Sequence, residues 1–428
     1  MALRHFERMS FDFIHENPDL EDELEQWGKM PEPSTEDHLF MLRVTTYDRV
    51  AERLKKAALE LKKSIVAETW GSSGQNVADF SLYSGALGTA FLLWKSFQVT
   101  NDAEDLCLCS EIVRACDSAS LGSRDVSFIC GRAGVCALGS VVAKSMGDND
   151  LMDCYVIKLK ECCSSKPTPM GLGNWNLDLS DGLLHGRAGY LWACLFINTY
   201  LGTETISPVQ LAPVIDKIFS NGRKLGRKGG SPLMFQWNGK NHWGAAHGLA
   251  GIMHVLMHFN LQENQQKEVK ETLLYMIKKR LPSGTYPLCE EEKGDLLVHW
   301  CHGAPGVALT LVKAAEFFGD KVFAKAAVDA GKVVWERGLL EHVGICHGIS
   351  GNAYVFHALY RLTGSPEFRF KAKSFACFLL DRGQKLLAEG EVRGGDHPFS
   401  LFEGIGGMAY LFLDMVQPAT AKIPAYEV

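Results

Sequence analysis

The chain has 428 residues, of which 46% are hydrophobic and 22% charged, and its formal net charge is −6. This composition is typical of a folded globular protein and excludes intrinsic disorder as the main state of the chain. The mild acidity excludes a nucleic-acid-binding role, because that role requires a basic surface that displaces the counterions of phosphates.

The first twenty residues carry scattered charges and no apolar segment of the kind that a signal peptide needs. The chain has thirteen cysteines, and in a large protein this odd number favours reduced thiols inside the cell over a disulfide framework. No apolar run reaches the ~18 to 20 residues of a membrane span. We therefore expect a cytoplasmic protein, with nuclear or peripheral plasma-membrane association as further locations, that is neither secreted nor transmembrane.

Residues 1–38 differ in composition from the rest of the chain. Nine acidic residues and one lysine lie between Glu16 and Asp37, and three prolines interrupt any helix there. We predict an irregular acidic N-terminal segment that flanks the body or packs on it. The body, residues 39–428, is predicted to be a single domain.

The first clear helix is predicted over residues 50–66. Its apolar side chains recur on one face at helical spacing: Val50, Leu54, Ala57, Ala58, Leu61 and Ile65. The opposite face carries four lysines, which we expect to be solvated: Lys55, Lys56, Lys62 and Lys63.

A G-x-x-G motif followed by an apolar run then occurs seven times. The motifs are Gly85–Gly88, Gly131–Gly134, Gly186–Gly189, Gly248–Gly251, Gly303–Gly306, Gly348–Gly351 and Gly404–Gly407. Their first glycines lie 46, 55, 62, 55, 45 and 56 residues apart, and each interval has room for a second, more charged helix. Each repeat is therefore predicted to be a helical hairpin with a glycine-initiated inner helix and an amphipathic outer helix.

Glycine costs about 1 kcal/mol relative to alanine inside a helix, so a glycine pair in every repeat requires a tight turn or a close approach there. Inner helices that are apolar on all sides favour a closed ring over an open solenoid, because a ring buries each of them. The predicted fold class is all-α, an α/α toroid of seven helical-hairpin repeats.

The residues before each first glycine are expected to meet at one end of the ring. Immediately before the glycines stand Ser84, Cys130, His185, His247, His302, His347 and Glu403. One position earlier stand Tyr83, Ile129, Leu184, Ala246, Cys301, Cys346 and Phe402. Side chains that can bind a metal are thus concentrated in repeats four to six.

Cys301 and Cys346, each followed by a histidine, are the strongest candidates for chemistry. Two thiolates and one imidazole at adjacent helix starts match a zinc site with three protein ligands and one open position. A buried cysteine often behaves as a small hydrophobic residue, but two Cys-His-Gly triplets in register favour metal binding. The pattern alone does not separate His302 from His347 as the third ligand.

The segments WCHGAPG, GICHGISGNAY, GAAHGLAGI and PFSLFEGIGG, with the C-terminal IPAYEV, resemble the eukaryotic LanC-like proteins, relatives of the bacterial lanthionine cyclases. The resemblance covers nearly the whole chain, and the sequences of these motifs are most similar to those of the plant branch. It implies an α/α toroid in which Cys301, Cys346 and His347 hold Zn²⁺. It also implies glutathione as co-substrate, added as a thiolate to dehydroalanine or dehydrobutyrine residues of damaged proteins.

The same resemblance suggests roles for further residues. His247, at the matching position of the neighbouring repeat, is the candidate general acid that protonates the α-carbon after thiolate addition. Arg4, Arg393 and Asp396 match the family's glutathione contacts. Arginine suits a peptide carboxylate because its guanidinium makes two parallel hydrogen bonds.

The chain departs from the family pattern at other positions. Glu341 and His342 stand where the family has a lysine, and a negative Glu341 would repel a glutathione carboxylate. Leu297 replaces an arginine of the bacterial cyclases, and Asp181 lies one position away from their essential aspartate. Lanthionine ring formation is therefore not expected.

The main alternative is a soluble adaptor in plant hormone signalling that retains the zinc site and binds a signalling protein or a membrane surface. A prenyltransferase-like toroid requires a basic cluster for a diphosphate, and the rim motifs offer little beyond Arg132 and Arg187, which we expect to be helix-face charges. A sugar-cleaving toroid requires paired rim carboxylates, but Glu403 is the one acidic residue at a repeat start.

Overall fold

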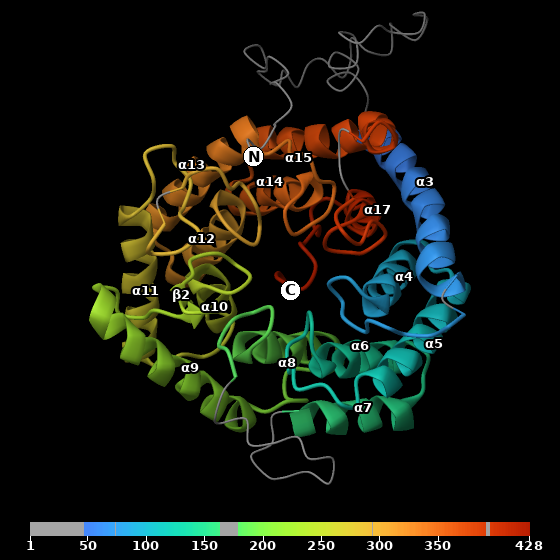
Figure 1. Ribbon diagram of the computed structural model, residues 1–428, viewed down its shortest axis with the longest axis horizontal. Helices are drawn as coiled ribbons and strands as arrows, with labels where there is room; N and C mark the ends of the chain where they lie inside the picture. The colour runs from blue at the N-terminus through green and yellow to red at the C-terminus, as the bar shows by residue number, and fades with distance from the viewer. Residues whose placement is uncertain (1–46, 73, 163–178, 293, 391–393) are drawn as a thin grey trace, which may run out of the picture.

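Two concentric rings of helices make up the part of the chain that the computed structural model describes, residues 47–72, 74–162, 179–292, 294–390 and 394–428 (Figure 1). The predicted acidic segment of residues 1–38 lies outside these residues. The inner helices are α4 (Ala86–Thr100), α6 (Arg132–Ser145), α8 (Arg187–Leu201), α10 (Leu249–Leu256), α12 (Ala304–Phe318), α14 (Ile349–Thr363) and α17 (Ile405–Asp414). The outer helices are α3 (Tyr47–Val66), α5 (Ala103–Ala119), α7 (Asn149–Cys162), α9 (Pro208–Gly229), α11 (Glu263–Lys278), α13 (Lys321–Arg337) and α15 (Pro366–Phe378).

The inner ring is closed. Each inner helix contacts the next one along the chain, and the last, α17, contacts the first, α4. The predicted toroid of seven helical hairpins is therefore confirmed. No helix among the described residues is both long enough and apolar enough to cross a membrane.

The seventh hairpin joins the two ends of the described chain. The outer partner of α17 is α3, the first described helix, and the hydroxyl of Tyr47 donates to the carbonyl of Met415 at 2.7 Å. After α15 come short segments, η3 (Leu379–Gly383) and α16 (Gln384–Ala388), that lead toward α17. The ring thus closes by pairing the first outer helix with the last inner one.

Each inner helix begins immediately after the first glycine of its motif, as predicted. The preceding loop folds back onto the helix start, so the second glycine meets the backbone of its own loop. A Cβ at Gly351 would lie 1.9 Å from the carbonyl oxygen of Ile345. Gly303 adds a second requirement, because its φ of 105° disfavours any side chain.

A belt of backbone hydrogen bonds runs around the ring through the positions two before the first glycines. In five of the seven steps, the N–H at this position donates to the carbonyl at the same position of the next repeat: Leu184 to Ala246, Ala246 to Cys301, Cys301 to Cys346, Cys346 to Phe402, and Phe402 to Tyr83. Leu82 N–H to Ile129 O, and Ser127 Oγ to Leu184 O, complete the circuit. The belt places these positions side by side.

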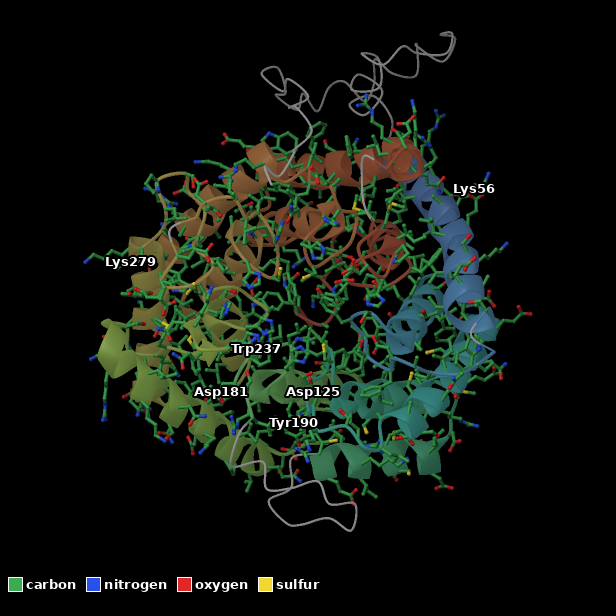
Figure 2. The ribbon with its side chains drawn as sticks, in the orientation of Figure 1. Lys56, Asp125, Asp181, Tyr190, Trp237 and Lys279 are labelled. Carbon is green, nitrogen blue, oxygen red and sulfur yellow. The ribbon has the colours of Figure 1, made fainter. Side chains whose placement is uncertain are left out.

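The outer surface is charged as predicted, with one exception. Figure 2 shows Lys56 and Lys279 pointing away from the ring. Lys62, however, is buried, with its Nζ 2.6 Å from Asp105 and 3.2 Å from the hydroxyl of Ser96. The prediction of a solvated Lys62 was wrong, because the helix turns this lysine toward a carboxylate on a neighbouring helix.

Arg132 and Arg187 are also not the helix-face charges that we expected. Both are buried, and they form ion pairs with Asp117 and Asp181 at 2.9 and 2.8 Å. A buried guanidinium needs such a partner, since the charge would otherwise be desolvated without compensation.

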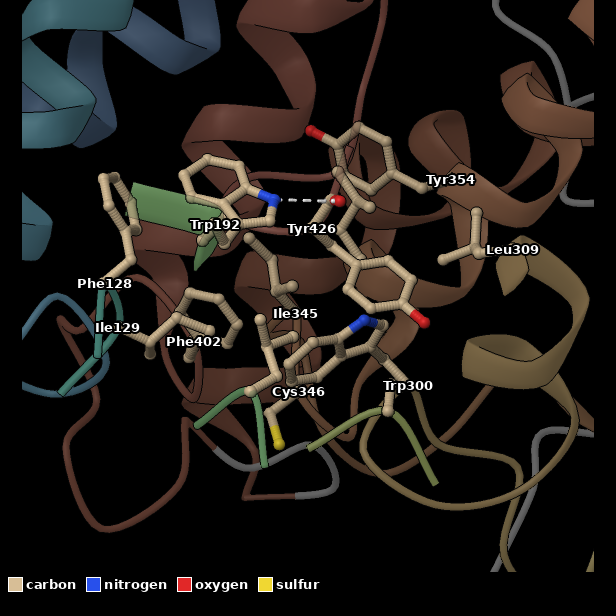
Figure 3. Close-up of a cluster of buried hydrophobic side chains, with 14 of the residues drawn as sticks. Phe128, Ile129, Trp192, Trp300, Leu309, Ile345, Cys346, Tyr354, Phe402 and Tyr426 are labelled. Carbon is tan, nitrogen blue, oxygen red and sulfur yellow. Dashed lines mark hydrogen bonds between the residues drawn. The ribbon is translucent and has the colours of Figure 1, made fainter. Parts of the chain in front are cut away.

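The C-terminal residues fill the middle of the ring (Figure 1). Figure 3 shows Tyr426 inside a buried cluster with Trp300, while the sulfur of Cys346 lies at the edge of this cluster. The carbonyl of Tyr426 accepts from Nε1 of Trp192 at 3.0 Å and from Nε2 of His254 at 2.9 Å. The core beneath the rim is therefore held partly by the end of the chain.

The close approach at the second glycine yields a prediction. Gly351→Ala should lower the free energy of unfolding by about 3 kcal/mol or more, because its Cβ would collide with backbone atoms that cannot rotate away. Gly122→Ala is the control, since a Cβ there meets no atom within 4 Å. Urea unfolding of both variants measures the difference, and equal midpoints would contradict the packing role of Gly351.

Candidate active site

The belt brings the two cysteines of the Cys-His-Gly triplets together. The N–H of Cys301 donates to the carbonyl of Cys346 at 3.2 Å, and the two thiols are hydrogen-bonded to each other. Their residues are 7% and 3% exposed. The predicted ligand sulfurs therefore lie side by side in a buried position.

The pKa values of the two thiols are shifted in opposite directions. The hydrogen bond from Cys301, supported by His347 and Tyr83, lowers the pKa of Cys346 against the opposing effect of burial. The same thiol–thiol hydrogen bond, together with burial, raises the pKa of Cys301. Cys346 is thus the sulfur that more readily becomes a thiolate.

His347 and His302 occupy the same position in adjacent repeats but have different neighbours. His347 is hydrogen-bonded to the sulfur of Cys346; burial lowers its pKa, but this hydrogen bond and nearby negative groups raise it overall. The ring of His302 instead lies near His242 and His247, with centroid distances of 5.7 and 6.4 Å. The geometry therefore favours His347 as the partner of the two thiols.

Two residues that sequence reasoning did not select complete this side of the site. Tyr83 hydrogen-bonds to Cys346, and its ring stacks on Phe402 at 5.2 Å. Glu403 lies close enough to affect the pKa values of Tyr83 and His347, and its buried Oε2 has no hydrogen-bond partner. A buried carboxylate oxygen without a partner is typical of a place where an ion or a ligand binds.

These residues fit a zinc ion by the chemistry of their donor atoms. Two thiols and one imidazole, joined through the sulfur of Cys346, are the ligand types of a zinc site with an open position. Among the described residues no group of three such side chains is already arranged around a common point; instead, they hydrogen-bond to one another. Binding of a metal would exchange these hydrogen bonds for metal–ligand bonds.

A second group of rings lines the rim beside the thiols. His247 stacks on Trp237 with a centroid distance of 4.6 Å, and His185 and His242 lie 5.9 and 6.0 Å away. Burial, then the charges of its histidine neighbours, lowers the pKa of His247 to about 3. His247 is therefore uncharged at neutral pH, and the proton that it can offer is that of a neutral N–H.

Trp237 reaches this group from the strand pair β1 (Gln236–Trp237) and β2 (Lys240–Asn241). Asn238 and Gly239 join the strands with φ values of 47° and 78°, the geometry that an Asn-Gly pair favours in a tight hairpin. The Asn-Gly dipeptide is the sequence signal that predicts this hairpin.

The predicted glutathione contacts are placed unevenly. Asp396 is exposed and contributes to the raised pKa of His347, so it lies beside the thiol site. Arg4 and Arg393 lie outside the described residues. Glu341 is half-buried, and the ring of its neighbour His342 is 4.7 Å from that of His347. The residue that follows Glu341 in the chain therefore borders the thiol site.

Asp181 has a structural position. Its carboxylate accepts hydrogen bonds from Arg187 at 2.8 Å and from Asn221 at 3.0 Å. This carboxylate therefore holds the guanidinium of Arg187, the first residue of α8.

A family model described as lanthionine synthetase C-like protein matches residues 76–428. The LanC-like protein GCL1 of Arabidopsis thaliana is 39% identical over 431 residues, covering 98% of this chain and 99% of that protein. Glutathione S-transferase LANCL1 of Danio rerio is 36% identical over 366 residues, covering 84% of this chain and 87% of that protein. Among solved structures, nisin cyclase covers 92% of this chain and 93% of its own with a TM-score of 0.42 and 16% identity.

The ion pair below α8 yields a prediction for stability. Asp181→Ala should lower the free energy of unfolding by about 3–5 kcal/mol, because it removes the carboxylate opposite the buried guanidinium of Arg187. Asp381→Ala is the matched control, since Asp381 pairs with Arg53 at the same 2.8 Å but on the surface, where the loss should be about 0–1 kcal/mol. Chemical denaturation of both variants tests the contrast, and similar losses would rule out a structural role for Asp181.

Proposed function

The chain belongs to the lanthionine synthetase C-like family, and we propose that it is a zinc-dependent enzyme that adds glutathione to dehydroalanine and dehydrobutyrine residues of damaged proteins. The observation that supports this proposal is that the thiols of Cys301 and Cys346 are hydrogen-bonded to each other and that His347 is hydrogen-bonded to the sulfur of Cys346. The name of the Danio rerio relative, a glutathione S-transferase, supports glutathione as the thiol.

In this proposal Cys301, Cys346 and His347 hold the zinc ion. A zinc ion in such a site keeps a coordinating thiol deprotonated, and so supplies a thiolate at neutral pH. Tyr83 and Glu403 surround the ligands: Tyr83 can donate a hydrogen bond to the Cys346 sulfur, and the free oxygen of Glu403 can accept one. Both contacts orient the ligand sulfur and imidazole.

The reaction forms a bond between the glutathione sulfur and the β-carbon of the unsaturated residue. Negative charge then develops at the α-carbon and on the adjacent carbonyl oxygen. A buried neutral imidazole is suited to donate a hydrogen bond to such an oxygen, and we assign this role to His247. The sequence predicted that His247 is a general acid. We now assign it hydrogen-bond donation alone, because an imidazole with a pKa of about 3 does not hold a second proton at pH 7.

Glutathione offers two carboxylates and one ammonium group for recognition. Arg4 and Arg393 are proposed to bind the carboxylates, and Asp396, exposed beside His347, is proposed to bind the ammonium. Glu341 disfavours a carboxylate at its own position. We therefore expect glutathione to lie with its carboxylates away from Glu341.

Zinc content tests the ligand assignment. Purified protein should contain about one zinc per chain, and Cys301→Ala, Cys346→Ala and His347→Ala should each lose most of it, because each removes one of three ligands. Cys194→Ala, another buried cysteine, and His302→Ala should keep it. Retention of zinc by both rim-cysteine variants would refute the site, and loss in His302→Ala with retention in His347→Ala would exchange the two histidines.

Glutathione transfer tests the reaction. The wild-type protein should add one glutathione to a dehydroalanine peptide, as measured by mass spectrometry. His247→Phe should keep its zinc and lower kcat by ~10²–10³-fold, the usual effect of losing a donor to a developing oxyanion. His247→Gln retains an N–H and should recover part of the rate. A wild-type protein that contains zinc but does not accelerate the addition would favour the adaptor role instead.

A further inference from the structure

A carboxylate–imidazole pair joins two neighbouring repeats on the rim beside His247. Oδ2 of Asp125 lies 2.6 Å from Nδ1 of His185. The other oxygen of Asp125 accepts from the backbone N–H of Ser127 at 2.9 Å, which fixes the carboxylate. Asp125 stands six residues before the first glycine of repeat two, and His185 stands immediately before that of repeat three. The pair therefore links the loops that precede two successive inner helices.

The second ring nitrogen of His185 is available to a substrate. Nε2 has no hydrogen-bond partner among the described residues, and it is accessible to solvent. The side chain keeps 36% of its surface exposed. Its ring is within 11° of parallel to those of both Trp237 and His247, at centroid distances of 5.5 and 5.9 Å. His185 and His247 therefore face the same part of the rim.

The addition of a thiol to a dehydroamino acid needs a temporary proton carrier. The thiol must lose a proton before the sulfur attacks, and the α-carbon must gain one afterwards. His247 is poorly suited to carry it, because burial keeps this imidazole neutral. A carboxylate bonded to one ring nitrogen of a histidine fixes its tautomer and stabilises the imidazolium that forms when the other nitrogen takes a proton.

We propose that His185, oriented by Asp125, accepts the proton of the glutathione thiol and returns it to the α-carbon of the substrate; this assignment rests on the function proposed above. The S–H bond breaks and the proton moves to Nε2 of His185. The C–S bond forms at the β-carbon, and the π electrons move to the α-carbon and its carbonyl. The Nε2–H bond then breaks as the α-C–H bond forms, so His185 ends neutral and no oxidant or reductant is required.

Repeat one provides a built-in comparison. Asp79 stands at the same register as Asp125, and its carboxylate accepts from the N–H of Ser81 at 2.7 Å and from the hydroxyl of Ser84 at 2.6 Å. The loop geometry is thus the same, but the partner is a hydroxyl, which does not carry a proton as a cation at neutral pH. Asp79→Asn is therefore a matched control for Asp125→Asn.

The test follows both the rate and the configuration of the product at the α-carbon. The wild-type protein should give a single α-epimer, because the proton arrives from one side. His185→Gln should keep its zinc, lower kcat by ~10²–10⁴-fold and give both epimers, since solvent then supplies the proton. Added imidazole should restore part of the rate of His185→Ala. Asp125→Asn should lower kcat with little change in KM, whereas Asp79→Asn should keep both the rate and the single epimer.

Two outcomes would overturn the assignment, and they are distinguishable. An active wild-type protein whose His185→Gln variant retains full kcat and a single epimer would leave the proposed function intact and remove His185 from the proton path. A wild-type protein that transfers no glutathione would remove the proposed function, and the assignment of His185 with it. Equal losses in Asp125→Asn and Asp79→Asn would reduce Asp125 to a loop-capping residue.

Discussion

The belt of backbone hydrogen bonds at the rim fixes the order in which the loops of the ring lie side by side. It links the loop before each inner helix to the loop of the next repeat, from Leu184 through Cys301 and Cys346 to Tyr83. Glycines keep the loops close to the helix starts, since a Cβ at Gly351 or Gly306 would lie about 2 Å from a backbone oxygen. Residues from repeats that are far apart in sequence therefore become neighbours in a fixed order. Each repeat can therefore contribute one side chain to a functional site at the rim.

The rim site has two parts, which differ in the protonation of their side chains. On one side, hydrogen bonds among Cys301, Cys346 and His347 favour a thiolate on Cys346. On the other side, burial keeps His247 neutral, while His185 is bonded to a carboxylate. The proposed metal ligands thus adjoin imidazoles of two kinds, one suited to donate a hydrogen bond and one suited to carry a proton. These two parts correspond to the two requirements of a thiol addition, which are formation of the thiolate and transfer of the proton to the α-carbon.

The sequence was sufficient to predict the features that recur at the same position in every repeat. The seven hairpins, the helix starts after each glycine and the adjacency of Cys301 and Cys346 follow from the spacing of the motifs. Contacts between different elements could not be predicted in this way. Lys62 with Asp105, and Asp125 with His185, are pairs whose members are 43 and 60 residues apart, and no local pattern specifies them. The pairing of α3 with α17 was missed for the same reason, because it depends on ring closure and not on the repeat.

We propose that Cys301, Cys346 and His347 hold a zinc ion and leave one position for a thiol. X-ray absorption at the zinc edge measures this most directly, because zinc–sulfur and zinc–nitrogen distances differ, at about 2.3 Å and about 2.0–2.1 Å. With zinc bound in this way, we expect two sulfur ligands in the purified protein and a third when saturating glutathione is added. A zinc ion without sulfur ligands, or a sulfur count that glutathione leaves unchanged, would contradict it.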